Sequence, residues 1–207
     1  METRAYYKSK KETEMKNLYT YEGILTLSLI FLLSCTNKDK RTNPVEEKNT
    51  DETFISALSE AEATITTQTD ESITTYLYMK DALVNEDSAT AAAAGSNLTK
   101  QLKDYKVDSY DKEDQENLQK IIDDAILRSQ YIAENSIVIQ REHFDMLSKN
   151  MIDLIEITGT TKKLYLVYCP MYNNNKGAQW LSDSEEIQNP YYGSAMMTCG
   201  EVQKEFN

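Results

Sequence analysis

Glycine, proline and histidine are scarce in this chain, and each shortage excludes a class of structure or site. The 207 residues include six glycines and three prolines, which excludes a collagen-like or loop-dominated chain. With a single histidine, a metallohydrolase cluster of the H-E-x-x-H type cannot form. The sequence also has no P-loop, no G-x-G-x-x-G turn and no C-x-x-C redox pair. We therefore expect a protein that is not an enzyme.

An excess of basic residues is also missing. The chain has 34 acidic against 22 basic side chains, a formal net charge of −12. Nucleic acids are dense polyanions and require a basic footprint on their partner, so we expect no nucleic-acid binding. The acidity is compatible with cation handling, although by itself it indicates only a well-solvated surface.

A long apolar run is the third absence. Residues 24–33 are uncharged and mostly apolar, but a membrane span needs about 20 residues. Their length matches the apolar core of a secretory signal peptide, which we expect to cover residues 1–34. Residues 1–14 are a candidate for a misassigned start, because Met15 gives a more natural beginning.

Cys35 follows this run directly and is the expected point of membrane attachment. The preceding Leu32-Leu33-Ser34 resembles the cleavage box of bacterial lipoproteins, with Cys35 as the lipidated first residue. The alternative is a coincidental cysteine after an ordinary signal. The lipoprotein interpretation predicts a chain anchored in the cell envelope by acyl chains, at the outer membrane on its periplasmic side.

Hydrophobic periodicity divides the remaining chain into three parts. Residues 35–52 are polar and include Pro44, which is typical of a disordered tether. Residues 53–159 show the 3, 4 spacing of amphipathic helices, and their short connections predict an antiparallel bundle of about four helices. We expect a short helix at 54–63, a threonine-rich linker or start signal at 64–70, and the four main helices at 70–84, 89–105, 111–134 and 137–157.

Two local features of the helical part are informative. Asp70 or Ser72 could cap the first main helix, and the turn at 85–88 offers the next cap. The helix at 89–105 is rich in alanine and contains Gly95, which costs up to about 1 kcal/mol relative to alanine. Its small side chains would let it approach a neighbouring helix closely.

The period changes to two after Thr160, which indicates strands. We expect strands at 164–169, 178–181 and 199–206, a turn at 173–177, and a polar connection at 182–188 for which a helix is one alternative. Gly159 lies where a helix-terminating glycine belongs. Residues 160–207 are therefore predicted to form a small antiparallel β unit packed on the bundle, which gives an α+β fold.

Sulfur concentrates in this β unit. Cys169 and Met171 are two residues apart, as are Met197 and Cys199, and such pairs share one side of an extended chain. In a helix, Met196 and Cys199 would share a face instead. Thiolates and thioethers select Cu(I) and other soft metal ions. The alternatives are a Cys169–Cys199 disulfide, or buried apolar cysteines with methionine as core filler.

Two residues of the helix at 137–157 are further candidates. His143 would complete a soft-metal site if its helix packs under the β unit, but such a histidine is more often structural. His143 and Cys169 could form a base and nucleophile, but no family signature surrounds either residue. Arg141 is expected on the inner face, where it pairs with a buried carboxylate or caps carbonyl groups; the alternative is an anion contact.

Several of these residues together resemble a bacterial envelope domain of unknown function. The resemblance extends over residues 70–205 and is carried by Cys169-Pro170-Met171, Trp180-Leu181-Ser182, Asn189-Pro190-Tyr191-Tyr192-Gly193, Cys199-Gly200-Glu201-Val202 and, in the helical half, Gln140-Arg141-Glu142-His143-Phe144. That family occurs as stand-alone lipoproteins and fused to periplasmic adaptor subunits of copper, silver and other heavy-metal efflux pumps.

The resemblance implies heavy-metal handling or efflux in the envelope. The expected partner is a metal-efflux adaptor or another envelope protein, and the expected cofactor is Cu(I) or another soft metal ion. The expected ligands are Cys169, Met171, Met196, Met197, Cys199 and His143. The alternative function is an interaction or assembly module without metal, in which Cys169 and Cys199 form a structural disulfide.

Overall fold

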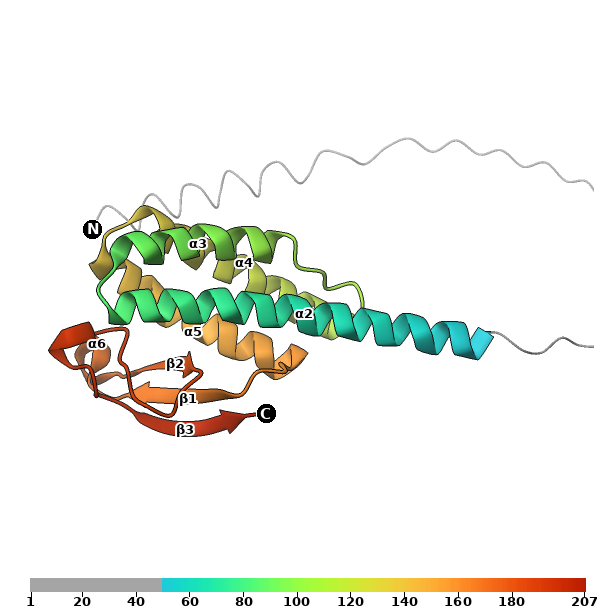
Figure 1. Cartoon of the computed structure of the whole chain (residues 1–207). Coiled ribbons are helices and arrows are strands. Elements are labelled where there is room, and N and C mark those ends of the chain that lie inside the picture. The colour runs from blue at the N-terminus through green and yellow to red at the C-terminus, as the bar shows by residue number, and fades with distance from the viewer. Residues whose placement is uncertain (1–49) are drawn as a thin grey trace, which may run out of the picture. The chain divides into compact units, whose positions relative to one another are not determined.

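Four long helices of the described chain pack as a bundle, and a small sheet follows them at the C-terminus (Figure 1). The structure, a computed structural model, describes the backbone of residues 50–207 and the side chains of residues 67–207. The helices are α2 (Thr50–Val84), α3 (Ser88–Lys103), α4 (Lys112–Glu134) and α5 (Ile137–Thr158). Short connections make neighbouring helices antiparallel, and the predicted α+β fold is confirmed. The predicted signal peptide, Cys35 and the tether up to residue 49 lie outside the described residues.

Helix ends follow the local signals for three of the four helices. Asp87 caps α3, where its carboxylate accepts a hydrogen bond from the Thr90 amide at 2.9 Å, and Asp111 caps α4. Gly159 ends α5 with a φ of 70°, as predicted. No helix in the described part of the chain is long and apolar enough to cross a membrane.

The expected linker at 64–70 is wrong, because α2 runs without a break from Thr50 to Val84. Threonine lowers helix propensity by only a few tenths of a kcal/mol per residue, and this stretch has no glycine or proline to end the helix. Asp70 therefore caps no helix. Its carboxylate instead accepts hydrogen bonds from Thr160 and Thr161, in the connection that leaves α5.

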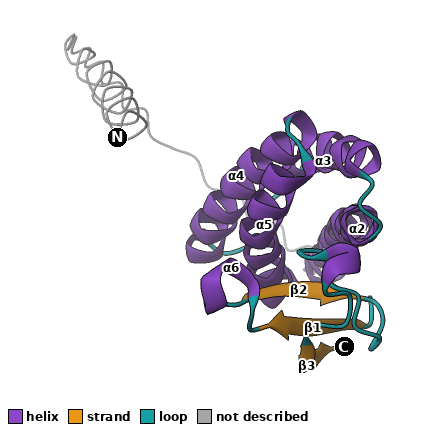
Figure 2. Ribbon diagram, turned by 90° about the vertical axis from the view of Figure 1, so that its left-hand side faces the viewer, coloured by secondary structure: helices purple, strands orange, loops and turns teal. Residues whose placement is uncertain are grey.

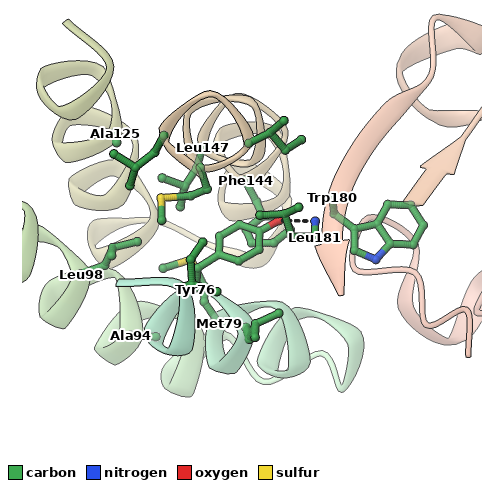
Figure 3. Close-up of a cluster of buried hydrophobic side chains, with 14 of the residues drawn as sticks. Tyr76, Met79, Ala94, Leu98, Ala125, Phe144, Leu147, Trp180 and Leu181 are labelled. Atoms are coloured by element: carbon green, nitrogen blue, oxygen red, sulfur yellow. Dashed lines mark hydrogen bonds between the residues drawn. The ribbon is translucent and has the colours of Figure 1, made fainter. Parts of the chain in front are cut away.

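The core of the bundle is formed by the apolar faces of all four helices (Figure 3). Its fully buried members include Ile73, Met79, Leu98, Leu118, Ile132, Phe144 and Leu147. These residues follow the helical period seen in the sequence, so burial of one face per helix accounts for the bundle.

α3 approaches α4 closely at Gly95. A Cβ atom placed on Gly95 would lie 2.7 Å from the carbonyl oxygen of Ser129 and 3.1 Å from the amide nitrogen of Ala133. Both are backbone atoms of a helix and cannot move aside independently. The expectation that small side chains permit a close helix–helix approach is confirmed at this residue.

We expect Gly95→Ala to destabilise the protein, although alanine is the better helix former. Propensity favours alanine by about 1 kcal/mol, whereas overpacking at a tight contact costs about 1–3 kcal/mol. We expect a net loss of about 1 kcal/mol or more in the free energy of unfolding, measured by urea titration with circular dichroism. The neighbouring exposed residue gives the control: Ser96→Ala is expected to leave stability unchanged or slightly higher. A stabilised Gly95→Ala variant would contradict the close approach.

The C-terminal sheet has three antiparallel strands in the order β2-β1-β3. The strands are β1 (Leu164–Cys169), β2 (Ala178–Ser182) and β3 (Glu201–Phe206). β1 and β2 are joined by a single turn, α6 (Tyr172–Asn175), in which Asn173, Asn174 and Asn175 have φ values of 52°, 57° and 64°. This left-handed run is the turn that the asparagines predict.

The segment between β2 and β3 departs from the prediction in one respect. Residues 183–188 contain no helix, so the polar connection does not take the helical form that the sequence left open. The only regular element of the segment is a short 3-10 turn, η1 (Gly193–Ala195). Ser182 begins the irregular path by accepting a hydrogen bond from the Ser184 amide, and this local bond competes with helix formation.

The sheet meets the bundle through β2, whereas β3 lies farthest from the helices (Figure 2). The free edge of β2 is closed by buried tyrosine hydroxyls: the Leu181 amide donates to Tyr76 Oη at 3.2 Å, and Tyr191 Oη donates to the Gln179 carbonyl. Ser148 of α5 shares a hydrogen bond of 2.7 Å with Tyr76 Oη. These bonds satisfy backbone groups that an open edge would leave unpaired, and bundle and sheet form one compact unit.

Candidate functional site

Cys169 and Cys199 are joined by a disulfide, with their Cα atoms 5.6 Å apart and a sequence separation of 30 residues. Cys169 ends β1 and is fully buried, whereas Cys199 is partly buried just before β3. Of the alternatives that the sequence left open, the structure contains the disulfide. In this state neither sulfur is a thiolate, and a thiolate is the form of cysteine that binds metal. A metal site that includes these two residues therefore requires their reduction.

The chain around the methionines is neither the extended strand nor the regular helix that would bring a methionine and a cysteine to the same side. Met171 has a helix-like backbone, with φ −86° and ψ −17°, and its side chain is 46% exposed while Cys169 is buried. The Cys199 amide donates to the Met196 carbonyl at 3.1 Å, so Met196, Met197 and Cys199 lie in a turn rather than in a strand or helix. The chain therefore turns directly after Cys169, in the loop that follows β1, and directly before Cys199, in the loop that follows η1. In the described residues, no three His, Cys, Asp or Glu side chains group as metal ligands.

Asn189 holds together the loop between β2 and β3 through its hydrogen bonds, and the sequence analysis did not identify it. Its amide donates to the Met197 carbonyl at 2.8 Å, and its side-chain nitrogen donates to the Cys199 carbonyl at 2.7 Å. Its side-chain oxygen accepts from the amides of Tyr191 and Tyr192, at 2.8 and 3.1 Å. Asn189 is fully buried, so these bonds form away from water. An Asn-Pro pair is typical of a turn, but it does not indicate a residue whose hydrogen bonds fix both ends of a loop.

Trp180 is buried in the core and lies against the chain that follows Cys199. It points to the side of β2 opposite to Leu181 (Figure 3) and is 1% exposed. A Cβ atom on Gly200 would lie 2.8 Å from Cη2 of Trp180, so the chain directly after Cys199 rests on the indole ring. Tyr191 packs edge-on against the same ring, with centroids 5.8 Å apart. We call residues 164–207 the C-terminal lobe; Trp180 is its largest fully buried side chain.

His143 contacts α4. Its ring stacks on Tyr131 of α4 at a centroid distance of 4.2 Å, and its Nδ1 atom is buried without a hydrogen-bond partner. Burial, and then the neighbouring Arg128 guanidinium, lower the pKa of His143, which favours the neutral imidazole. The proposed ligand role required its helix to present this ring to the β unit, whereas the ring lies at the interface between α4 and α5.

Arg141 caps carbonyl groups, which is one of the two roles expected for it. Its Nε donates to the Pro190 carbonyl at 2.9 Å and its Nη2 to the Leu83 carbonyl at 3.0 Å. A long ion pair of 3.9 Å to Glu86 accompanies these bonds. Since Leu83 is in the last turn of α2 and Pro190 is in the C-terminal lobe, Arg141 ties α5 to both.

An open cleft lies between α5 and the C-terminal lobe. Its volume is about 570 Å³, within the usual range for ligand pockets. One stripe of α5 lines it, at the i, i+3, i+4 and i+7 positions, and the loops of the lobe form the other wall. The lining residues are Glu142, Asp145, Met146 and Lys149 from α5, and Tyr172, Asn173, Asn174 and Tyr192 from the lobe.

The cleft has a negative electrostatic character. Asp145 is only 7% exposed, and its Oδ1 atom has no hydrogen-bond partner; the nearest cation is the ammonium of the exposed Lys149, at 3.8 Å. Burial raises the pKa of Asp145, opposed by Lys149. Burial, and then the charges of Asp145 and Glu142, raise the pKa of Tyr172 to about 12. Both carboxylates therefore interact electrostatically with the Tyr172 hydroxyl.

Comparison with known proteins identifies part of the chain. A family model described as a protein of unknown function (DUF3347) matches residues 73–163. No curated protein and no solved structure matches the chain. The matched residues run from α2 to the connection before β1, so the disulfide and Asn189 lie beyond them. Over residues 73–163 the chain is therefore similar to DUF3347, a domain of unknown function.

Proposed function

We propose that the protein is a non-enzymatic binding or assembly module of the cell envelope, in which the helical bundle is the scaffold and the C-terminal lobe is closed by a structural disulfide. The Cys169–Cys199 disulfide is the observation that carries this proposal. Disulfides persist outside the cytoplasm and are rare within it. This agrees with the signal peptide and the lipidated Cys35 expected at the outer membrane, on its periplasmic side.

The surroundings of the disulfide favour a structural over a redox role. Reactive cysteines are partly exposed and lie in electropositive surroundings, whereas Cys169 is fully buried. Asn189 and Trp180 hold the chain on either side of Cys199. The expected partner is a metal-efflux adaptor or another envelope protein, which rests on the sequence resemblance.

Handling of a soft metal ion of the Cu(I) or Ag(I) type is the second candidate function. The 5.6 Å between the two Cα atoms would leave two thiolates side by side after reduction. Met171 is two residues from Cys169, and Met196 and Met197 are three and two residues from Cys199. Cu(I) held by two or three sulfurs could pass to a partner by ligand exchange. His143 is left out of this site because its ring packs against α4.

A metal titration separates the two functions. The full chain would be titrated with Cu(I) against a competing chelator in three forms: oxidised, reduced, and the double variant Cys169→Ser/Cys199→Ser. The free thiols of protein taken from the envelope would be counted in parallel. The assembly function predicts a quantitative disulfide in that protein and no tight Cu(I) binding by any form.

Tight binding by the reduced chain alone, lost in the double variant, would support metal handling and contradict the assembly function. Met171→Leu then tests the thioether, and Met146→Leu is the matched control because Met146 lies on α5. Metal handling predicts weaker Cu(I) binding in the first variant and no change in the second.

A further inference from the structure

The cleft between α5 and the C-terminal lobe has a feature that the disulfide and the proposed assembly role leave unused. Asp145 is 7% exposed as a residue and its side chain is 11% exposed, while its Oδ1 atom is buried and lacks a hydrogen-bond donor. A buried, unpaired acceptor is costly, and a charged one more so. Lys149 offsets this only in part, since its ammonium is 3.8 Å away on an exposed side chain. A ligand that brings a positive charge into the cleft would stabilise this carboxylate.

The cleft walls favour a cation with an apolar body. Two carboxylates, Glu142 and Asp145, face one ammonium group, so the lining is negative overall. Tyr172 and Tyr192 line the opposite wall with rings at an edge-on angle of 78° and a centroid distance of 5.8 Å. Tyrosine faces attract ammonium and guanidinium groups, and Met146 adds an apolar surface.

The ring positions in this wall are fixed by the fold. Tyr172 stacks on the buried Tyr191 at 4.4 Å, and the Tyr192 hydroxyl donates to the Met171 carbonyl at 2.9 Å. Asn189 holds the amides of Tyr191 and Tyr192. The aromatic wall is therefore ordered without a ligand, which lowers the entropic cost of binding.

A bare metal ion fits this lining less well. Hard cations take six or more oxygen ligands, whereas the described residues bring no three His, Cys, Asp or Glu side chains together here. The cleft is also far larger than a single ion requires.

We propose that this cleft binds an organic cation, a guanidinium or primary ammonium group on an apolar stem, with Asp145 as the main anionic partner and Tyr172 and Tyr192 as the aromatic wall. The cation is either a free amine or an arginine or lysine side chain of a peptide. The inference does not depend on the proposed assembly role or on metal handling.

The test is isothermal titration of the full chain, in mild detergent at low salt, with two probes. Agmatine represents the free cation, and a blocked pentapeptide with one central arginine represents the side chain. We expect saturable binding of at least one probe with a stoichiometry of one, and the tighter of the two identifies the source. A neutral alcohol of the same length as agmatine is expected not to bind.

Variants locate the site. Asp145→Asn is expected to weaken binding about tenfold or more, and Tyr172→Leu several-fold. Asp153→Asn is the matched control, because Asp153 is on α5 outside the cleft, and we expect it to bind as the unmodified chain does. Circular dichroism checks that each variant is folded. The proposal fails if neither probe saturates at millimolar concentration, if the alcohol binds as well, or if the folded Asp145→Asn variant keeps full affinity.

Discussion

Loss of the Cys169–Cys199 disulfide is expected to lower the free energy of unfolding by about 3–4 kcal/mol. The reason lies in the unfolded state, where the disulfide closes a loop of 30 residues and removes conformational freedom. Chain-entropy arguments give about 3.6 kcal/mol for a loop of this length at 25 °C. The effect is large because native domains are stable by only about 5–15 kcal/mol.

The measurement compares the oxidised chain with the variant Cys169→Ala/Cys199→Ala by urea unfolding, both in a Cys35→Ser background. Alanine is preferred to serine here because Cys169 is fully buried and a hydroxyl at that position would lack a partner. The control adds a reductant to both proteins: only the oxidised chain is expected to lose stability. Equal unfolding midpoints before reduction would show that the bond does not constrain the chain.

Trp180→Ala is expected to lower the free energy of unfolding by about 3–5 kcal/mol. Trp180 is the largest fully buried side chain described, and its indole ring packs against the backbone at Gly200. Its removal leaves a cavity that the lobe cannot fill, because the disulfide and Asn189 hold the overlying loop in place.

Urea unfolding followed by far-ultraviolet circular dichroism measures this loss, since the variant lacks the only tryptophan as a fluorescent probe. Tyr78→Ala is the matched control because Tyr78 is aromatic but 59% exposed, and we expect a change within about 0.5 kcal/mol. A Trp180→Ala variant as stable as Tyr78→Ala would mean that the lobe does not depend on this ring.

The disulfide and the cleft are connected through the chain. Tyr172 and Tyr192, the aromatic wall of the cleft, both lie between Cys169 and Cys199 in sequence. The Asn189 side chain accepts a hydrogen bond from the Tyr192 amide and donates one to the Cys199 carbonyl. The loop that the disulfide closes is therefore the same loop that presents the aromatic wall to Asp145 on α5.

Local sequence signals determined most of the fold. The 3, 4 spacing predicted the four main helices, although it divided α2 at residues 64–70. Asp87 and Gly159 marked ends of α3 and α5, and the asparagine run after β1 predicted its turn. Each of these signals acts between residues a few positions apart, through a cap, a helical face or a φ preference. Even Gly95 was placed in a helix of small side chains, although the direction of its effect on stability needed the distance to Ser129.

Only the tertiary structure decided the chemistry of the candidate sites. Spacing allowed Cys169 and Cys199 to be either ligands or a disulfide, and the disulfide depends on β1 and the loop before β3 meeting across 30 residues. His143 could have faced the lobe, but the packing of α5 places its ring against Tyr131. Asp145 had no sequence signal, and the Asn-Pro pair at Asn189 indicates only a turn, because a hydrogen-bonding hub and a buried carboxylate are defined by the residues that surround them. Interactions between distant residues depend on how the elements pack, which no local pattern specifies.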